Sequence, residues 1–208
     1  MPNPPEGGLL AESILRAAAS LIEDEGVEAL TMRAVAARAG YSPTAIYLVF
    51  KDKEELLERT IAYAYESFLT SVLPVGGDED FPSRLRRINA DFVRWGVTNP
   101  NMFRMLNASV RRSLEVPDLA STMRRVWNEG RDQLEREMRE GGIPSGMDPT
   151  AFAQLAWSTL HGIVWLTISD LLFDERAEGA EVSSVERAVG LADAFSSMLL
   201  TGSTTTPK

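Results

Sequence analysis

The sequence contains no cysteine and only one histidine, His161. Without thiols, the chain can form neither disulfides nor thiolate metal sites. A lone imidazole also argues against a histidine-based zinc site and against a catalytic dyad. We therefore expect no metal, no cofactor and no enzymatic activity.

Targeting signals are missing as well. The N-terminal MPNPPEGGLL has no basic segment followed by a long apolar run, which argues against a secretory signal. Residues 152–173 are the stretch most like a membrane span, but they include Gln154, Ser158 and Asp170. We expect this stretch to form a buried helix in a cytoplasmic protein that does not associate with membranes.

Positive charge is scarce. A formal net charge of −9 is unfavourable for contact with nucleic acid, because attraction to phosphates supplies most non-specific affinity. The charge is distributed unevenly, however. Residues 29–53 carry Arg33, Arg38, Lys51 and Lys53 against Asp52, a net +3 that leaves −12 for the remainder. This pattern indicates a small basic head on an acidic body.

Helical periodicity dominates the rest of the sequence. Every long segment repeats apolar residues with helical spacing, and none alternates like a strand. With 208 residues, 44% of them hydrophobic, the chain can bury one or two cores. We predict an all-α fold of about nine helices, over residues 9–25, 32–39, 43–50, 53–73, 83–98, 99–109, 116–140, 151–173 and 182–200.

Residues 31–53, TMRAVAARAGYSPTAIYLVFKDK, have the spacing of a helix-turn-helix followed by a further helix. The small Ala36 lets the second helix approach, and Gly40 can adopt a positive φ in the turn. Ile46 then fills the angle between the helices. The segment therefore predicts a head that reads DNA.

Each helix in this segment starts with a suitable capping residue. Thr31 is a good N-cap for residues 32–39, and Ser42 followed by Pro43 is an N-cap with proline at the first helical position. Asp52 and Glu55 have the spacing of a capping box. Because these weak signals agree with one another, they strengthen the prediction.

The wider segment Ile14–Leu57, ILRAAASLIEDEGVEALTMRAVAARAGYSPTAIYLVFKDKEELL, resembles the TetR family of bacterial transcriptional repressors. The resemblance implies a DNA-binding domain at residues 1–52, a ligand-binding and dimerisation domain at 53–202 and a disordered tail at 203–208. LHGI at Leu160–Ile163 and NPNMFRML at Asn99–Leu106 are similar to a subgroup with a Trp-His-Gly signature, although Leu160 replaces the tryptophan. Val49 and the missing basic N-terminal arm also depart from the family pattern and suggest fewer phosphate contacts.

A recognition helix presents its N-terminal and outward residues to the major groove. In residues 43–50 we expect Ile46 and Val49 to point inward. Thr44 suits a base edge, Ala45 and Leu48 suit thymine methyl groups, and Tyr47, by resemblance, donates to a phosphate. Alternatively, Tyr47 and Leu48 pack in the head, and Arg33 and Arg38 are solvated charges, the better interpretation for Arg38. The predicted DNA contacts are Thr31, Arg33, Ser42, Pro43, Thr44, Ala45, Tyr47, Leu48, Lys51 and Lys53.

The last two long helices are the expected dimer interface, since two such hairpins can form a four-helix bundle. A monomer core is the alternative for the same residues. The predicted interface residues are Trp157, Leu160, Val164, Ile168, Val185, Val189, Ala192, Phe195 and Leu199.

The body is also rich in aromatic and methionine side chains, which can line a cavity for a small apolar or amphipathic effector. His161 either contacts this ligand or is a satisfied core residue, and the individual methionines and tryptophans also fit a plain core. The predicted ligand residues are Trp95, Met102, Phe103, Met105, Met123, Trp127, Trp157, His161 and Trp165. The resemblance implies that the ligand releases the homodimer from a palindromic operator by shifting its conformational equilibrium.

Two other functions fit the sequence. One keeps the DNA-binding head but places it under the control of a protein partner, or of no signal. The other is a helical small-molecule carrier, which has less support.

Overall fold

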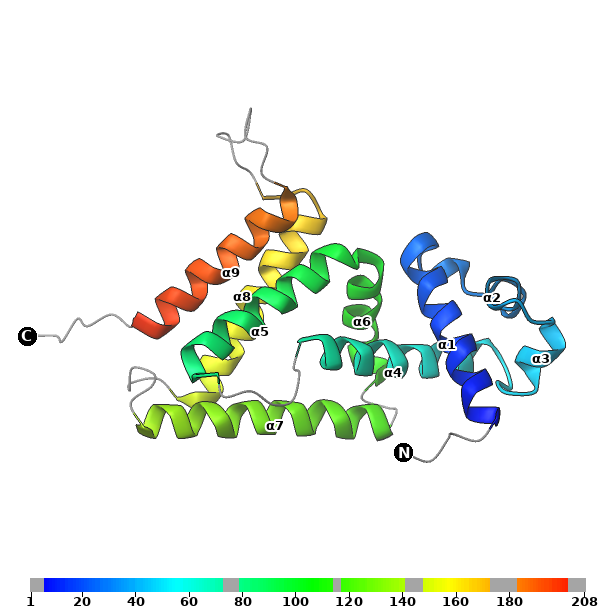
Figure 1. Ribbon diagram of the computed structural model, residues 1–208, viewed down its shortest axis with the longest axis horizontal. Helices are drawn as coiled ribbons and strands as arrows, with labels where there is room; N and C mark the ends of the chain where they lie inside the picture. The colour runs from blue at the N-terminus through cyan, green and yellow to red at the C-terminus, as the bar shows by residue number, and fades with distance from the viewer. Residues whose placement is uncertain (1–5, 73–78, 114–116, 141–147, 173–182, 202–208) are drawn as a thin grey trace, which may run out of the picture. The chain divides into compact units, whose positions relative to one another are not determined.

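The structure is a computed structural model that describes residues 6–72, 79–113, 117–140, 148–172 and 183–201. Within these ranges it contains nine α-helices, one short 3-10 helix and no strand, in agreement with the predicted all-α fold (Figure 1). The elements are α1 (Glu6–Glu25), η1 (Val27–Ala29), α2 (Met32–Ala39), α3 (Pro43–Tyr47), α4 (Lys53–Val72), α5 (Phe81–Thr98), α6 (Pro100–Ser113), α7 (Pro117–Glu140), α8 (Pro149–Ile168) and α9 (Ser184–Thr201).

The helices form two compact units. The first combines residues 1–70 with residues 99–121, so it contains α1 to α4 and α6. The second combines residues 71–98 with residues 122–208 and contains α5, α8, α9 and most of α7. The first unit thus extends beyond the head predicted at residues 1–52, while the predicted tail at 203–208 lies outside the described residues.

The core of the first unit is built on the apolar face of α1. Ile14 and Ile22 of α1 are fully buried, together with Val35 of α2, Ile46 of α3 and Leu56 of α4. Apolar residues four or eight positions apart lie on one face of a helix, so α1 presents one continuous stripe to its neighbours. This stripe holds the helix-turn-helix in place.

Helix α6 joins the same unit through Glu23 of α1. The Glu23 carboxylate accepts hydrogen bonds from the backbone N–H of Met102 at 2.8 Å and of Asn101 at 3.4 Å. The Asn101 side chain in turn donates to the backbone carbonyl of Glu23 at 2.8 Å. Because the first N–H groups of a helix have no partner within the helix, an acidic side chain from α1 completes the start of α6.

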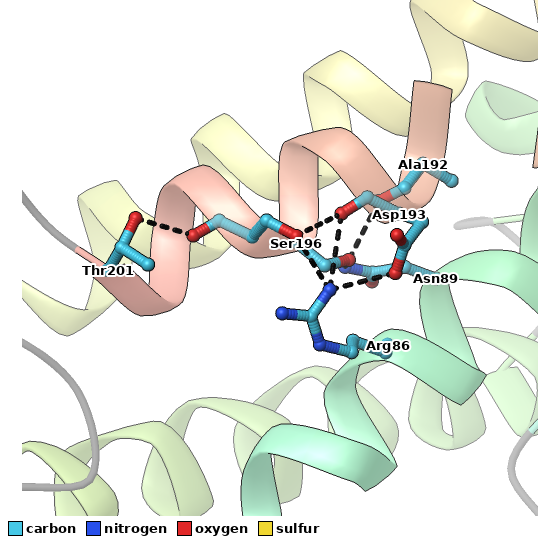
Figure 2. A network of polar contacts seen from close by, with 7 residues as sticks. Arg86, Asn89, Ala192, Asp193, Ser196 and Thr201 are labelled. Atoms are coloured by element: carbon cyan, nitrogen blue, oxygen red, sulfur yellow. Dashed lines mark hydrogen bonds and ion pairs between the residues drawn. The ribbon is translucent and has the colours of Figure 1, made fainter. Parts of the chain in front are cut away.

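A seam of polar side chains joins α5 and α9 in the second unit (Figure 2). Buried Asn89 donates to the hydroxyl of buried Ser196 at 3.0 Å, and Ser196 donates to the Ala192 carbonyl at 2.7 Å. Beside them, Arg86 donates to Asp193 at 2.8 Å and to Ser197 at 2.7 Å. Buried polar groups with partners of this kind fix one register of packing between the two helices.

Helix α8 is much less buried than its composition predicts. We expect a helix buried on several sides, but Leu155, Trp157, Trp165 and Leu166 are each at least 39% exposed. Among the described residues, α8 is the one helix that is long and apolar enough to cross a membrane, judged by length and composition alone. Helix α8 therefore has an apolar face that the described residues leave uncovered.

Candidate nucleic-acid interface

The turn between α2 and α3 has the predicted geometry. The Thr31 hydroxyl accepts a hydrogen bond from the Ala34 backbone N–H at 3.1 Å and caps α2. Gly40 ends α2 with a φ of 74°, a left-handed conformation that glycine adopts at no steric cost. Ala36 is buried, as its role in the close approach of the helices requires. These features confirm the helix-turn-helix prediction at each of the three positions.

Helix α3 is shorter than predicted but begins where expected. Ser42 caps it by accepting from the Ala45 backbone N–H at 3.2 Å, and Pro43 occupies its first turn. The helix ends at Tyr47 rather than at Phe50, and Leu48 follows it with a helical backbone, φ −73° and ψ −22°. The chain then leaves the helix, and Phe50 enters the core.

Two fully buried side chains, Ile46 and Phe50, fix the orientation of α3. Val49, which we expect to point inward, is only half-buried, and Phe50 replaces it as the second inward residue. Arg59 of α4 lies over the Phe50 ring, 5.0 Å from its centroid. The sequence analysis misses Phe50, although it lies four residues after Ile46 and therefore falls on the same side of the segment.

The opposite face of α3 is open to solvent. Thr44, Tyr47 and Leu48 share this face, since residues three and four positions apart are neighbours on a helix. Tyr47 is 56% exposed and Leu48 is 81% exposed. Both exposures exclude the alternative in which these two side chains form part of the head's core.

Three basic side chains of the segments before and after α3 are exposed. Arg33 of α2 and Lys53 of α4 are exposed, as is Lys51, whose Nζ lies 3.6 Å from an Asp52 oxygen. One half of the predicted capping box is confirmed, the cap from Asp52, because the Glu55 carboxylate bonds to Lys51 rather than back to Asp52. Glu55 accepts from the Lys51 backbone N–H at 2.7 Å and donates its own N–H to Asp52 at 2.9 Å. The Glu55 N–H lowers the pKa of the Asp52 carboxyl, with a smaller effect from Lys51, so Asp52 is ionised at neutral pH.

Arg38 does not act as a free surface charge. Its guanidinium donates to the Ser20 hydroxyl at 2.9 Å and forms ion pairs with Asp24 and with Glu25 on α1. The hydrogen bond to Asp24 is the main reason that the pKa of Arg38 is raised. Arg38 therefore ties α2 to α1, and the expectation that it is a solvated surface charge is wrong.

The residues predicted to line a ligand cavity fall into both compact units. Met102, Phe103 and Met105 of α6 are buried in the first unit. The others belong to the second unit, where two of them pack together with Phe92 of α5. The His161 ring lies 4.1 Å from that of Trp157 and 4.9 Å from that of Phe92, between centroids. Trp95, Met123 and Trp127 are half-buried, whereas Trp165 is exposed.

Several predicted interface residues lie instead in the core of the chain. Leu160 and Val164 of α8 and Ala192 of α9 are buried within the protein, which corrects their assignment to an external surface. The predicted residues Ile168, Val185, Val189, Phe195 and Leu199 are half-buried, and Trp157 is exposed. The exposed apolar residues that the prediction omits are Leu155, Trp165, Leu166, Leu191 and Met198.

A capped helix-turn-helix with an uncovered face on its second helix is the architecture of a helix-turn-helix DNA-binding protein. Residues 14–60 match the bacterial regulatory proteins of the tetR family, and residues 85–190 match the tetracyclin repressor-like C-terminal domain. The chain therefore belongs to the TetR family and is a DNA-binding transcriptional regulator. Proteins of this family are soluble regulators rather than enzymes, and they are typically dimers.

Individual proteins are similar to this chain in sequence or in fold. The chain is 27% identical over 137 residues to the nucleoid occlusion factor SlmA of Marinomonas sp., covering 65% of this chain and 69% of that protein. The fold is similar to that of a transcriptional regulator from Rhodococcus sp., with a TM-score of 0.66, 21% identity and coverage of 95% and 99%. It is also similar to the fatty acid degradation regulator FadR from Bacillus halodurans, with a TM-score of 0.64, 18% identity and coverage of 99% of both chains.

Proposed function

We propose that this regulator is a cytoplasmic repressor that binds a palindromic operator as a homodimer and is released by a small apolar or amphipathic ligand. One observation carries the DNA-binding part. The buried pair Ile46 and Phe50 leaves Thr44, Tyr47 and Leu48 uncovered on one face of α3. An uncovered face on the second helix of a helix-turn-helix is the part that enters the major groove.

The proposed contacts divide into two groups. Tyr47, Lys51, Lys53 and the capping residues Thr31 and Ser42 bind phosphates and set the position of the head on the duplex. Bases are approached by Pro43, Thr44, Ala45 and Leu48, and Arg33 reaches a base or a phosphate. Phosphate contacts position a protein on DNA, and base contacts give it specificity.

The proposed dimer interface is the uncovered apolar face of α8 together with exposed residues of α9. Trp157 and Trp165 of α8 and Leu191 and Met198 of α9 are each at least 40% exposed in the single chain. A second copy of the hairpin would cover this face by a twofold arrangement, in which the same surface serves both partners. A dimer also places two heads on one operator, which accounts for the palindrome.

For the effector, the support comes from the aromatic group on α5 and α8. Phe92, Trp157 and His161 pack ring against ring, with Trp157 and Phe92 centroids 5.6 Å apart. Burial lowers the pKa of His161, so the ring is neutral at physiological pH. A neutral cluster of aromatic rings suits contact with an apolar ligand that has few polar groups.

Control by a protein partner, or by no effector, is the second candidate. Its support is the similarity to proteins named nucleoid occlusion factors, a description that includes no small molecule. A screen for small molecules that both raise the melting temperature and release bound DNA separates the two candidates. Ligand control predicts compounds with both effects, whereas the second candidate predicts none.

Selection of bound fragments from a random DNA pool tests the DNA-binding proposal. We expect the parent protein to enrich a palindrome and a Thr44→Ala, Tyr47→Ala double variant to enrich none. A Thr70→Ala variant is the control, because Thr70 is an exposed residue of α4 whose hydroxyl donates to the Glu66 carbonyl of its own helix. Equal enrichment by all three proteins, or enrichment by none, would overturn the assignment of α3 as the reading element.

A further inference from the structure

The exposed part of the helix-turn-helix lacks charged and amide side chains. From Tyr41 to Phe50 the sequence is YSPTAIYLVF, which contains no acidic, basic or amide side chain. Arginine and lysine pair with guanine in the major groove, asparagine and glutamine pair with adenine, and acidic side chains accept from cytosine. The face of α3 therefore has none of the side chains that make two-point hydrogen bonds to a base.

What the face does present is apolar. Leu48 is the most exposed large apolar residue among those described, at 81%, and it follows the last turn of α3 with a helical backbone. On the same face, four residues earlier, Thr44 adds a methyl group and a hydroxyl. Ala45, half-buried beside it, adds another methyl group. An exposed leucine contributes nothing to the core of the head, so its side chain is available for another contact.

In the major groove, thymine is the base with an apolar group, its C5 methyl. We propose that the head reads its half-site mainly through thymine methyl groups, with Leu48 as the residue that covers one of them. This inference rests on the proposed function of α3 and adds the class of base that it recognises. The same chemistry extends to 5-methylcytosine, which carries a methyl group at the same ring position.

The effect of one methyl contact can be estimated. Burial of one methyl-sized group changes affinity by about fourfold at room temperature. The contribution is smaller than that of a two-point hydrogen bond, so several such contacts in each half-site would build the specificity. We therefore expect an operator in which thymines recur at the positions covered by α3 in both halves.

The test uses deoxyuridine, which differs from thymidine only by lacking the C5 methyl. Each thymine of the selected operator is replaced in turn, in one half-site, and binding of the full-length protein is measured by fluorescence anisotropy. For the parent we expect a loss of about fourfold at the position beneath Leu48. A Leu48→Ala variant should bind the intact operator more weakly and show no further loss at that position, while Leu48→Met should keep the sensitivity. This pattern is a double-mutant cycle between a side chain and a base methyl.

The outcomes separate the inference from the function on which it rests. If the parent selects an operator but no deoxyuridine substitution changes its affinity, methyl reading is wrong and the DNA-binding function stands. A loss that persists unchanged in Leu48→Ala would also overturn the role of Leu48. If the parent selects no operator, both proposals fail. A further comparison places cytosine or 5-methylcytosine at the position of that thymine. Tighter binding to the operator with 5-methylcytosine than to the one with cytosine would support the inference.

Discussion

Ile46 and Phe50 show how two buried side chains determine what a short helix displays. Both are fully buried, and they lie four residues apart, so they hold one side of the α3 segment against the core. Every residue on the other side is then presented to solvent without further support. The exposed residues of α3 contribute little to the core, so substitutions of these residues should leave the free energy of unfolding almost unchanged.

Tyr47 tests whether a residue on the exposed face of α3 affects DNA binding without affecting stability. Tyr47→Phe removes only a hydroxyl from a side chain that is 56% exposed, so we expect an unchanged melting temperature. If the hydroxyl bonds to a phosphate, affinity should fall by about 1 kcal/mol for specific and random DNA alike. Anisotropy titrations with both kinds of duplex measure the loss. Tyr41→Phe is the control, since Tyr41 is exposed but is not among the proposed contacts, and an effect of equal size there would contradict the assignment.

His161 makes stability depend on pH. Burial is the main cause that lowers its pKa below the ordinary value of 6.5, and the hydrogen bond between Nδ1 and the Trp157 carbonyl at 2.9 Å only partly opposes it. The unfolded chain therefore binds a proton at this residue more readily than the folded chain does. Above about pH 7.5 the imidazole is neutral in both states, so His161 does not change the free energy of unfolding. That free energy falls as the pH drops through 6.5 toward the lowered pKa of the folded state.

A comparison with His161→Asn isolates this contribution, because asparagine can still donate to the Trp157 carbonyl. We expect the melting temperature of the parent to fall more between pH 7.5 and 5.5 than that of the variant. Carboxylates titrate equally in both proteins, so the difference between them reports the histidine. Parallel pH profiles would show that His161 is not desolvated as described.

At the level of helices, the polar seam between α5 and α9 is the feature most sensitive to a single change. Ser196→Ala leaves the buried Asn89 amide without its Ser196 partner, and an unsatisfied buried group costs about 1–3 kcal/mol. Denaturant unfolding should show this loss with an unchanged slope. Ser197→Ala is the matched control, because Ser197 is less buried and its partner Arg86 keeps its ion pair with Asp193. Equal losses in both variants would contradict the role of burial.

The helix caps and several helix ends can be predicted from this sequence, whereas the exposed faces cannot. The predicted ends at Glu25, Ala39, Thr98 and Glu140 are confirmed, but those of α3, α6 and α8 are wrong. The caps at Thr31, Ser42 and Asp52 are confirmed, because each involves one side chain and a backbone group three residues away. The end of α8 is predicted at Phe173, outside the described residues, but α8 ends at Ile168. Asp170, with a φ of 55°, turns the chain just after this end. A residue in this left-handed conformation after a helix is usually glycine, so the aspartate does not indicate a helix end in the sequence.

The candidate DNA contacts could be placed on α3 from the sequence because the helix-turn-helix has a fixed spacing. In the body, the sequence does not show which face of a helix is exposed. Leu160 and Trp157 are three residues apart on one apolar helix, yet one is buried in the chain and the other is 43% exposed. When almost every position of a helix is apolar, periodicity cannot tell which face meets the chain's own core and which remains open. Contacts from distant parts of the sequence decide that, and they require a structure.

For the molecule as a whole, the uncovered face of α8 predicts that the single chain is not the active species. Trp165→Glu places a charge at a residue that is 48% exposed, so the fold of one chain should tolerate it. Across the proposed interface the same charge would be buried without a partner, and the dimer should dissociate. Light scattering at micromolar protein should report a monomer, and binding to the palindrome should be lost together with the dimer.

An exposed position on another helix provides the control for this experiment. Arg125 of α7 is exposed and pairs with Glu129 on its own helix, so Arg125→Glu should leave the dimer intact. A Trp165→Glu protein that remains dimeric would exclude α8 as the interface.

The contact between Glu23 and the start of α6 limits how the protein can be recombined. Exchanging heads between related regulators is a way to give one regulator a new target, and the boundary predicted from the sequence would place the junction at residue 52. A graft made there would separate the carboxylate at position 23 from the backbone N–H groups of Asn101 and Met102, which belong to the recipient. Functional chimeras should therefore need a donor with a glutamate at this position, so the exchangeable part of the chain is discontinuous.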